Sequence, residues 1–237
     1  MRHNKTIVVT GGSKGIGRAI IENFMEEGFD IITCSRNKTE LQQLKTDLES
    51  EFPAQTVHIM AADLSEEKFC MEFGQFVLSI TECPDVLINN TGHFIPGQIS
   101  SEEPGVLESM LKSNLLSAYY VTRSILPSFI QAGKGHIFTI CSTASIIPYI
   151  NGGSYCISKF ALYGFTKVLR EELKDKNIRV TSVLPGATLT ASWDGIDLPD
   201  TRFIKPDDIG KAVLSCWKLS THAVVEEILI RPQLGDI

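Results

Sequence analysis

Short runs of apolar and β-branched residues alternate with helix-length segments along the whole chain. The runs cover residues 5–10, 30–34, 56–62, 85–89, 136–141, 178–184 and 226–232, and the helical patterns cover 16–27, 40–51, 66–80, 106–131, 155–175 and 206–219. Strands joined through helices run parallel, and nearly continuous apolar runs are typical of strands that are covered on both faces. The alternation therefore predicts an α/β fold, a doubly wound parallel sheet of about seven strands with helices on both faces.

The chain is long enough to bury one sizeable core. With 237 residues, 43% of them hydrophobic, and no linker or repeat, the sequence predicts a single domain over residues 1–237. A formal net charge of −6 leaves no basic stripe for a phosphate backbone or an anionic bilayer. Neither nucleic acid nor a membrane is therefore expected as a partner.

Targeting and membrane-spanning segments are not expected either. The first ten residues pass from two basic residues into a short apolar strand, too short for the apolar part of a signal peptide. The apolar stretch 135–158 is interrupted by Pro148 and by Gly152 and Gly153, which is unlike a membrane span. These features favour a cytoplasmic protein.

Cysteine and histidine spacings do not indicate a metal site. The six cysteines form no CxxC pair, and the five histidines form no HxxxH or HExxH pattern. Unpaired thiols suit a reducing compartment, and small buried residues are their expected role. We expect no metal ion.

Polar or glycine-rich segments directly follow six of the seven predicted strands. They are residues 10–17 (TGGSKGIG), 35–37 (SRN), 62–64 (ADL), 89–92 (NNTG), 141–145 (CSTAS) and 185–190 (PGATLT). In open α/β sheets, ligands bind in the crevice outside the carboxyl ends of the strands. We expect these six segments to line one binding site.

Three glycines, Gly11, Gly15 and Gly17, stand between the first strand and the first helix. Glycine lets the backbone turn sharply and approach a ligand, and a helix N-terminus offers free N–H groups to a pyrophosphate. Such loops also occur as purely structural turns. The spacing GxxxGxG differs from the GxxxxGK(S/T) pattern, which disfavours a P-loop nucleotidase.

The end of the second strand favours NADP(H) over NAD(H). An NAD site usually presents an acid there to the ribose, whereas this strand ends in Ser35, Arg36 and Asn37, and the nearby Asp30 stands at its beginning. Arg36 and Lys14 can together bind a 2′-phosphate.

Tyr155 and Lys159 stand four residues apart and share one face of the predicted helix 155–175. An ammonium ~4.5 Å from a phenol stabilises the phenolate by roughly 3.7 kcal/mol, which predicts a pKa of about 7 for Tyr155 before desolvation acts. Such a phenol can protonate an alkoxide, or accept the proton of an alcohol in reverse. Ser142, after the fifth strand, can donate a hydrogen bond to the same substrate oxygen.

A tyrosine and a lysine at this spacing also occur on many helices without catalytic meaning. The glycine loop and Ser142 make catalysis the favoured interpretation here. A hydrolase is not indicated, because GGSYC places Cys156 where the nucleophile elbow GxSxG needs glycine.

Taken together, these motifs resemble those of the short-chain dehydrogenase/reductase family, single-domain branch. TGGSKGIG, NNTG, Asn114, Ser142, YCISK and PGATLT stand in the family's order and approximate spacing over essentially the whole chain. The resemblance implies a Rossmann-type sheet, Tyr155 as general acid/base and Ser142 as the group that orients the substrate oxygen. It also implies that Lys159 lowers the pKa of Tyr155 and holds the nicotinamide ribose, and that Asn114 positions Lys159 through a water molecule.

The glycine loop, the strand ends and the resemblance assign one set of NADP(H)-binding residues. They are Gly11, Ser13, Lys14, Gly15, Ile16, Gly17, Ser35, Arg36, Asn37, Asp63, Leu64, Asn90, Thr91, Gly92, Tyr155, Lys159, Pro185, Gly186 and Thr188. By resemblance, Asp63 and Leu64 border the adenine, and the residues from Pro185 onward contact the nicotinamide carboxamide. Thr91 departs from the alanine that the family more often has, so a slightly shifted cofactor is expected.

The segments 93–96, 145–150 and 189–205 flank Tyr155 and are expected to choose the substrate. They supply a predicted apolar pocket of Phe94, Ile147, Tyr149 and Trp193, which suits a ketone or a planar ring carbonyl. Residues 224–237 resemble the endings of bacterial family members related to sepiapterin reductases, which favours a small carbonyl compound.

These observations predict an NADPH-dependent oxidoreductase that acts on a small-molecule carbonyl or alcohol, similar to sepiapterin reductases. A 3-oxoacyl-carrier-protein reductase-like enzyme is the alternative within the enzyme class. A non-catalytic NADP-binding sensor or scaffold is the alternative outside it. Apolar residues on more than one side of helices 106–131 and 155–175 favour a homodimer or homotetramer.

Overall fold

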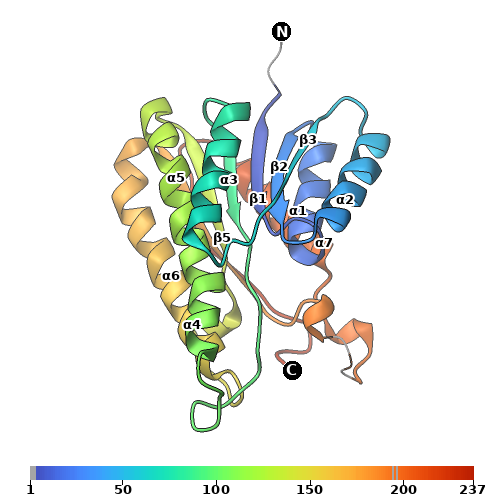
Figure 1. Cartoon of the computed structure of the whole chain (residues 1–237), viewed down its shortest axis with the longest axis vertical. Helices are drawn as coiled ribbons and strands as arrows, with labels where there is room; N and C mark the ends of the chain where they lie inside the picture. The colour runs from blue at the N-terminus through green and yellow to red at the C-terminus, as the bar shows by residue number, and fades with distance from the viewer. Residues whose placement is uncertain (1–3, 194, 196) are drawn as a thin grey trace.

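Seven parallel strands form the centre of the protein (Figure 1), in the order β3-β2-β1-β4-β5-β6-β7. The computed structural model describes residues 4–193, 195 and 197–237, so residues 1–3 and parts of the predicted substrate segment 189–205 lie outside the described residues. The strands are β1 (Thr6–Thr10), β2 (Asp30–Ser35), β3 (Val57–Ala61), β4 (Val86–Asn89), β5 (Gly135–Ile140), β6 (Ile178–Pro185) and β7 (Glu227–Ile230). The predicted Rossmann-type parallel sheet is confirmed, and its order reverses beside β1, which pairs with β2 on one side and β4 on the other.

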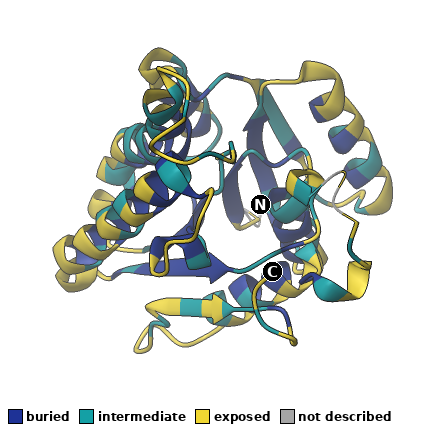
Figure 2. Ribbon diagram, turned by 90° about the horizontal axis from the view of Figure 1, so that it is seen from below, coloured by how far each residue is buried: buried dark blue, intermediate teal, exposed yellow. Residues whose placement is uncertain are grey.

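Helices cover both faces of this sheet (Figure 1). One layer contains α1 (Gly15–Glu26), α2 (Lys38–Glu51) and α7 (Pro206–Trp217). The opposite layer contains α3 (Glu67–Ile80), α4 (Val106–Met110), α5 (Ser117–Ala132) and α6 (Gly153–Leu173). The strands are largely buried between the layers, and exposed residues lie on the outer faces of the helices (Figure 2).

Each layer closes its own apolar core against the sheet. On the α1 side, Phe24, Phe29 and Trp217 pack edge to face, with ring centroids 4.8–6.1 Å apart. On the α3 side, Phe73 and Phe129 are fully buried against β-branched residues of the strands. Burial of this apolar surface is the main stabilising contribution to the fold.

The long helix predicted over 106–131 is interrupted. Between α4 and α5, residues Leu111–Leu116 form a π-helical segment, in which the backbone hydrogen bonds span one residue more than in an α-helix. Periodicity did not predict this segment, in which Asn114 contacts distant parts of the chain, as described below.

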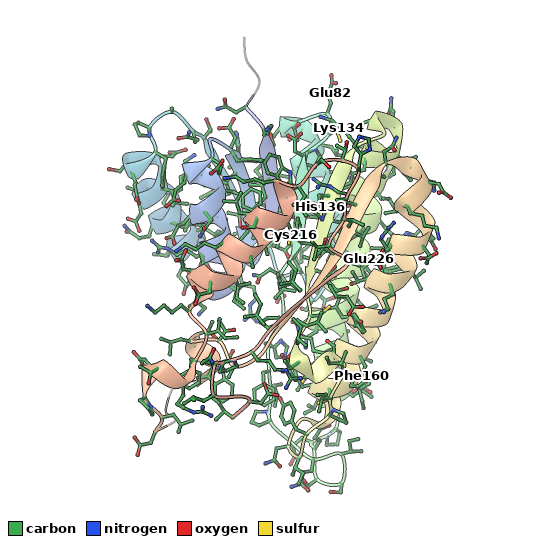
Figure 3. The ribbon with its side chains drawn as sticks, turned by 180° about the vertical axis from the view of Figure 1, so that it is seen from behind. Glu82, Lys134, His136, Phe160, Cys216 and Glu226 are labelled. Carbon is green, nitrogen blue, oxygen red and sulfur yellow. The ribbon has the colours of Figure 1, made fainter. Side chains whose placement is uncertain are left out.

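The edge strand β7 also differs from the prediction that helices cover every strand on both faces. Its residues alternate between exposed and intermediate, because it is the last strand and pairs only with β6. Two ion pairs join α6 to this edge: Lys167 pairs with Glu227, and Arg170 pairs with Glu226, which Figure 3 labels.

No helix within the described ranges is long and apolar enough to cross a bilayer. All six cysteines are free thiols, and four of them are buried.

A buried histidine lies on β5, at the start of the strand (Figure 3). His136 is 1% exposed, stacks on Phe138 with the ring centroids 3.8 Å apart, and lies with Nε2 2.7 Å from Thr181 Oγ1. Since the Thr181 hydroxyl donates to the carbonyl of Val225, its oxygen accepts from His136 Nε2, which assigns the proton to that nitrogen. Burial and the nearby Arg179 lower the pKa of His136 to about 2.

We predict that the protonation of His136 makes the fold acid-sensitive. His136 has a lower pKa in the folded state than in the unfolded state, so acid protonates it in the unfolded state first. The protein therefore has its full stability above about pH 6.5 and loses stability as the pH falls below that value. The loss should reach roughly 2 kcal/mol at pH 5. Urea denaturation at pH 7.5 and pH 5, compared between the wild type and His136→Gln, measures it. A variant that loses as much stability on acidification as the wild type would contradict this.

Candidate active site

The carboxyl ends of the strands open on one cavity of about 1620 Å³. It is lined by the segments that follow β1, β2, β3, β4, β5 and β6, together with residues of the 187–193 stretch. Every predicted cofactor-binding and substrate-pocket residue lines this cavity except Gly17, and every predicted catalytic residue except Asn114. The structure therefore brings the predicted residues together around one cavity. Gly17 and Asn114 are buried and do not line it.

The glycine loop after β1 needs its glycines for two different reasons. Gly11 and Gly15 have φ values of +67° and +59°, a region that L-residues rarely adopt. Gly17 lies inside α1, where a Cβ atom would be 2.5 Å from the carbonyl oxygen of Gly11 and 2.6 Å from Asn90 Nδ2. The loop thus leaves the N-terminus of α1 open to the cavity, as a pyrophosphate requires.

The segment after β4 forms hydrogen bonds with the start of the glycine loop. Asn90 Nδ2 donates to the carbonyl oxygens of Thr10 and Gly11, both at 3.0 Å. The Thr10 hydroxyl oxygen accepts the backbone N–H groups of Asn90 and Thr91 at 2.9 and 3.0 Å. Thr91 therefore forms these contacts with its backbone, and its side chain stands beside Gly11.

Two exposed cations border the end of the cavity beside β2. Arg36 and Lys14 both line it, and no ion pair involves either of them in the part of the chain that the structure describes. Asn37 caps α2, its side-chain oxygen accepting the N–H groups of Thr39 and Glu40. Exposed cations, open helix N–H groups and left-handed glycines form a donor set that fits a phosphorylated dinucleotide.

Glu40 was not predicted from the sequence. Its carboxylate accepts a hydrogen bond from the Ser13 hydroxyl at 3.2 Å, so an acid of α2 reaches the glycine loop. An acid in the first turn of a helix interacts favourably with the helix dipole, so its position there does not by itself indicate a site.

The helix α6 carries Tyr155 and Lys159 on one face, as predicted. Lys159 is only 6% exposed, and its ammonium donates to the carbonyl of Ile140 at 2.9 Å. Lys159 Nζ lies 5.8 Å from the centroid of the Tyr155 ring, and Phe94 meets the same ring edge to face, with centroids 4.9 Å apart. Phe94, from the segment after β4, thus packs against Tyr155, and Lys159 links α6 to the end of β5.

The pKa of Tyr155 differs from the predicted value of about 7. Burial raises the pKa of Tyr155 to about 12 and outweighs the lowering by its hydrogen bond with Ser142. Burial also lowers the pKa of Lys159 to about 8. The prediction was wrong because desolvation dominates, and the groups that shift the pKa of Tyr155 do not include Lys159, which the resemblance had implied would lower it.

Ser142 stands directly after β5 and is fixed by a short turn. Its hydroxyl oxygen accepts the N–H of Ala144 at 3.1 Å, and its own N–H donates to the Ser145 hydroxyl at 3.2 Å. This reciprocal pair holds Ser142 beside Tyr155, with both side chains lining the cavity.

Asn114 lies in the π-helical segment and contacts two distant parts of the chain. Its side chain accepts the N–H of His93 at 2.8 Å and donates to the carbonyl of His93 at 3.0 Å. It also donates to the Ser158 hydroxyl at 2.9 Å. A Cβ atom on Gly92 would lie 3.0 Å from Asn114 Oδ1 and 3.7 Å from Lys159 Nζ, so Gly92 lies beside both side chains. The amide thus joins the β4 segment to α6.

The predicted substrate-pocket residues lie at the outer part of the cavity. Ile147 and Tyr149 are about half exposed, and Trp193 packs against Phe203 with ring centroids 5.2 Å apart. The C-terminal residues Asp236 and Ile237 also line the cavity. Sequence analysis missed them, because no local pattern indicates that a chain end folds back to a site.

His93 is a second residue that the prediction assigned only to a segment. Its Nδ1 lies 2.9 Å from the Ser113 hydroxyl, and burial together with the Arg36 charge lowers its pKa. A histidine directly after NNTG was the only available signal.

Comparison with known proteins is consistent with this site. A family model described as short chain dehydrogenase matches residues 5–199. A sepiapterin reductase of Chlorobaculum tepidum is 28% identical over 243 aligned residues, covering 100% of this chain and 99% of the relative.

Two solved structures are similar over nearly their whole length. One is an alcohol dehydrogenase of the archaeon Thermococcus sibiricus, complexed with 5-hydroxy-NADP, with a TM-score of 0.91 at 26% identity, covering 98% of this chain and 97% of that one. The other is an L-sorbose reductase of Gluconobacter frateurii, complexed with NADPH and L-sorbose, with a TM-score of 0.89 at 26% identity, covering 97% and 95%.

We predict that Gly17→Ala lowers the free energy of unfolding by about 1–3 kcal/mol, because the new methyl group overlaps the glycine loop. Gly164→Ala in α6 is the matched control, since a Cβ atom there meets nothing within 4 Å. Alanine in a helix should stabilise that control by roughly 0.5–1 kcal/mol. Urea denaturation of both variants measures the difference, and equal stabilities would refute the packing argument.

Proposed function

Because the chain belongs to the short-chain dehydrogenase family, we propose that it is an NADPH-dependent reductase of a small carbonyl compound. The observation that carries this proposal is the convergence of Tyr155, Ser142 and Lys159 on a cavity that extends to the glycine loop. We propose that residues 1–237 form one catalytic domain.

NADP(H) is the proposed cofactor. Arg36, exposed directly after β2 where an NAD site usually has an acid, and Lys14, exposed in the glycine loop, support it. The structures of the similar archaeal alcohol dehydrogenase and of L-sorbose reductase contain 5-hydroxy-NADP and NADPH. Backbone N–H groups of the glycine loop would bind the pyrophosphate, and Lys159 would hold the nicotinamide ribose.

The reaction assigns one role to each catalytic side chain. When bound, the nicotinamide supplies a hydride to the carbonyl carbon. Tyr155 donates its phenolic proton to the oxygen, and its raised pKa keeps that proton in place throughout the neutral range. Ser142 donates a hydrogen bond to the same oxygen, where negative charge develops. Lys159, with a pKa of about 8, supplies a positive charge beside the tyrosine at pH 7.

The substrate class is proposed from the cavity wall and one relative. Phe94, Ile147, Tyr149 and Trp193 favour a small apolar or planar carbonyl compound, and the C. tepidum relative is a sepiapterin reductase. Activity with acetoacetyl thioesters would instead favour the alternative of a 3-oxoacyl-carrier-protein reductase-like enzyme. Binding of NADPH without turnover of any carbonyl would favour a sensor or scaffold, although such a protein has no need for a buried phenol.

A homo-oligomer is the proposed assembly. Phe160 and Val168 of α6 are 43% and 56% exposed, although both are large apolar residues on the outer face of a long helix (Figure 3 labels Phe160). Pairing this face with a second copy would remove apolar surface from water.

We predict that Tyr155→Phe lowers kcat at least a hundredfold and leaves NADPH binding within about threefold, because it removes only the proton donor. Tyr163→Phe is the matched control, since Tyr163 lies on the same helix and bonds to Glu227 at the sheet edge. NADPH oxidation is followed with sepiapterin, a 1,2-diketone, a quinone and acetoacetyl-CoA. Unchanged turnover by Tyr155→Phe on an active substrate would overturn the mechanism.

We predict that Arg36→Ala raises the Kd of NADPH by about 10-fold or more and that of NADH little. A hydrogen bond to a charged group contributes about 1.5–3 kcal/mol, and only NADPH has the 2′-phosphate. Fluorescence titration with both nucleotides measures the ratio, with Arg123→Ala on the distant α5 as the control. An unchanged ratio of the two Kd values would remove Arg36 from cofactor selection.

A further inference from the structure

The catalytic helix α6 begins without a capping side chain of its own. Its N-cap is Gly152, which has no side chain, so the N–H groups of the first turn need partners from elsewhere. The segment 97–102 supplies them. Gly153 N–H donates to the carbonyl of Gly97 at 3.1 Å, and Ser154 N–H donates to Glu102 Oε1 at 2.8 Å.

Glu102 binds Ser154 through both carboxylate oxygens. The Ser154 hydroxyl donates to Oε2 while the Ser154 N–H donates to Oε1. Ser154 is only 2% exposed, so the bonds are shielded from water on its side. A carboxylate at a helix N-terminus also interacts favourably with the helix dipole. The residue it holds immediately precedes Tyr155.

A tight turn over residues 98–102 places Glu102 beside Ser154. The N–H groups of Ser101 and Glu102 both donate to the carbonyl of Gln98 at 2.8 Å. Gln98 Nε2 donates to Asn151 Oδ1 at 3.0 Å, and the N–H of Gly97 donates to the carbonyl of Asn151 at 2.9 Å. The turn is therefore tied to the residues that lead into α6.

Two glycines provide the space that the carboxylate occupies. A Cβ atom on Gly153 would lie 2.3 Å from Glu102 Oε1, and one on Gly97 would lie 2.7 Å from Glu102 Cγ. Neither glycine has a positive φ, so conformational freedom does not explain them. Their small size matches the presence of the Glu102 side chain between them.

The same segment also contacts the reacting side chain. Phe94, three residues before Gly97, packs edge to face against the Tyr155 ring. His93 is held by Asn114, which binds Ser158 on the next turn of α6. Residues 93–102 thus contact α6 at its first turn, at Tyr155 and through Asn114.

From these contacts we propose that Glu102 is a positioning residue for the reductase: its carboxylate clamps the first turn of α6 and so sets the place of Tyr155. We call the bonds between Gly97–Glu102 and 151–154 the Glu102 clamp. The proposal rests on the proposed function, because it gives Tyr155 the role of proton donor. An error of 1 Å in the place of a catalytic group can reduce a rate about 100-fold.

The test compares Glu102→Ala with Glu102→Gln, Ser154→Ala and the neighbour Glu103→Ala. Glu103 is exposed, and its side chain has no hydrogen bond or ion pair among the residues that the structure describes. Glu103→Ala therefore removes the same negative charge as Glu102→Ala without removing a contact. Assays use sepiapterin, or the carbonyl of the panel that turns over fastest, well below each variant's Tm. Kd for NADPH and KM for the carbonyl are measured beside kcat.

We expect Glu102→Ala to lower kcat at least tenfold while the Kd of NADPH changes less than threefold. Glu102→Gln should recover most of the activity, because an amide can accept from the Ser154 N–H and donate to its hydroxyl. Glu103→Ala should match the wild type. Adding Ser154→Ala to Glu102→Ala should cause little further loss, because both changes remove the same contact.

The outcomes separate this proposal from the proposed function. If Tyr155→Phe is inactive while Glu102→Ala keeps the wild-type kcat, the positioning role is overturned and the reductase mechanism stands. If Glu102→Ala lowers Tm but not kcat, the clamp is merely structural and the proposal fails. An active Tyr155→Phe would instead overturn the proposed function.

A measurement without a substrate keeps the clamp testable if no carbonyl is reduced. Hydrogen exchange followed by mass spectrometry should show faster exchange in peptides covering 150–160 of Glu102→Ala, and unchanged exchange there in Glu103→Ala. Exchange equal to the wild type in Glu102→Ala would overturn the clamp. If the alanine variant fails to fold, Ser154→Ala replaces it, because it removes the hydroxyl contact to Glu102. Wild-type exchange in the 150–160 peptides of Ser154→Ala would then overturn the clamp.

Discussion

The parallel pairing of β1 with both β2 and β4 is the constraint on which the rest of the structure depends. Because the chain leaves β1 toward one side and returns through β4 on the other, the connections above these strands diverge and leave a crevice. The glycine loop, the β2 end and the NNTG segment all open on that crevice. The topology thus brings together residues that are distant in sequence, such as Thr10 and Asn90, which are 80 positions apart.

Backbone hydrogen bonding decides how the site is held within that crevice. Thr10, Asn90 and Asn114 place their side chains against backbone N–H and carbonyl groups that belong to no regular ladder. Buried polar groups of this kind are costly when they are unpaired, so the pairing fixes the loops. Asn114 does this from the π-helical segment, where its side chain contacts both His93 and Ser158.

Sequence patterns predicted most of the architecture. Seven apolar runs became the seven strands, within one or two residues at each end, because buried parallel strands have a strong compositional signal. The predictions failed where the outcome depends on environment. The pKa of Tyr155 is raised mainly by burial in the folded chain. The helix over 106–131 is interrupted at Leu111–Leu116, where Asn114 contacts distant segments. Glu102 carried no signal, since an acid in a polar loop is ordinarily solvated.

The sequence by itself determined the order of strands and helices, the glycines of the first loop, and the placing of Tyr155 and Lys159 on one helix face. These properties follow from periodicity and from the conformational range of single residues, which are local. Only the tertiary structure decided that Glu102, Asn114 and Phe94 meet α6, that Asp236 reaches the cavity, and that burial raises the pKa of the phenol. Such contacts join residues tens of positions apart, and desolvation depends on all the groups packed around a side chain. Local sequence therefore predicts neither the contacts nor the shift of the pKa.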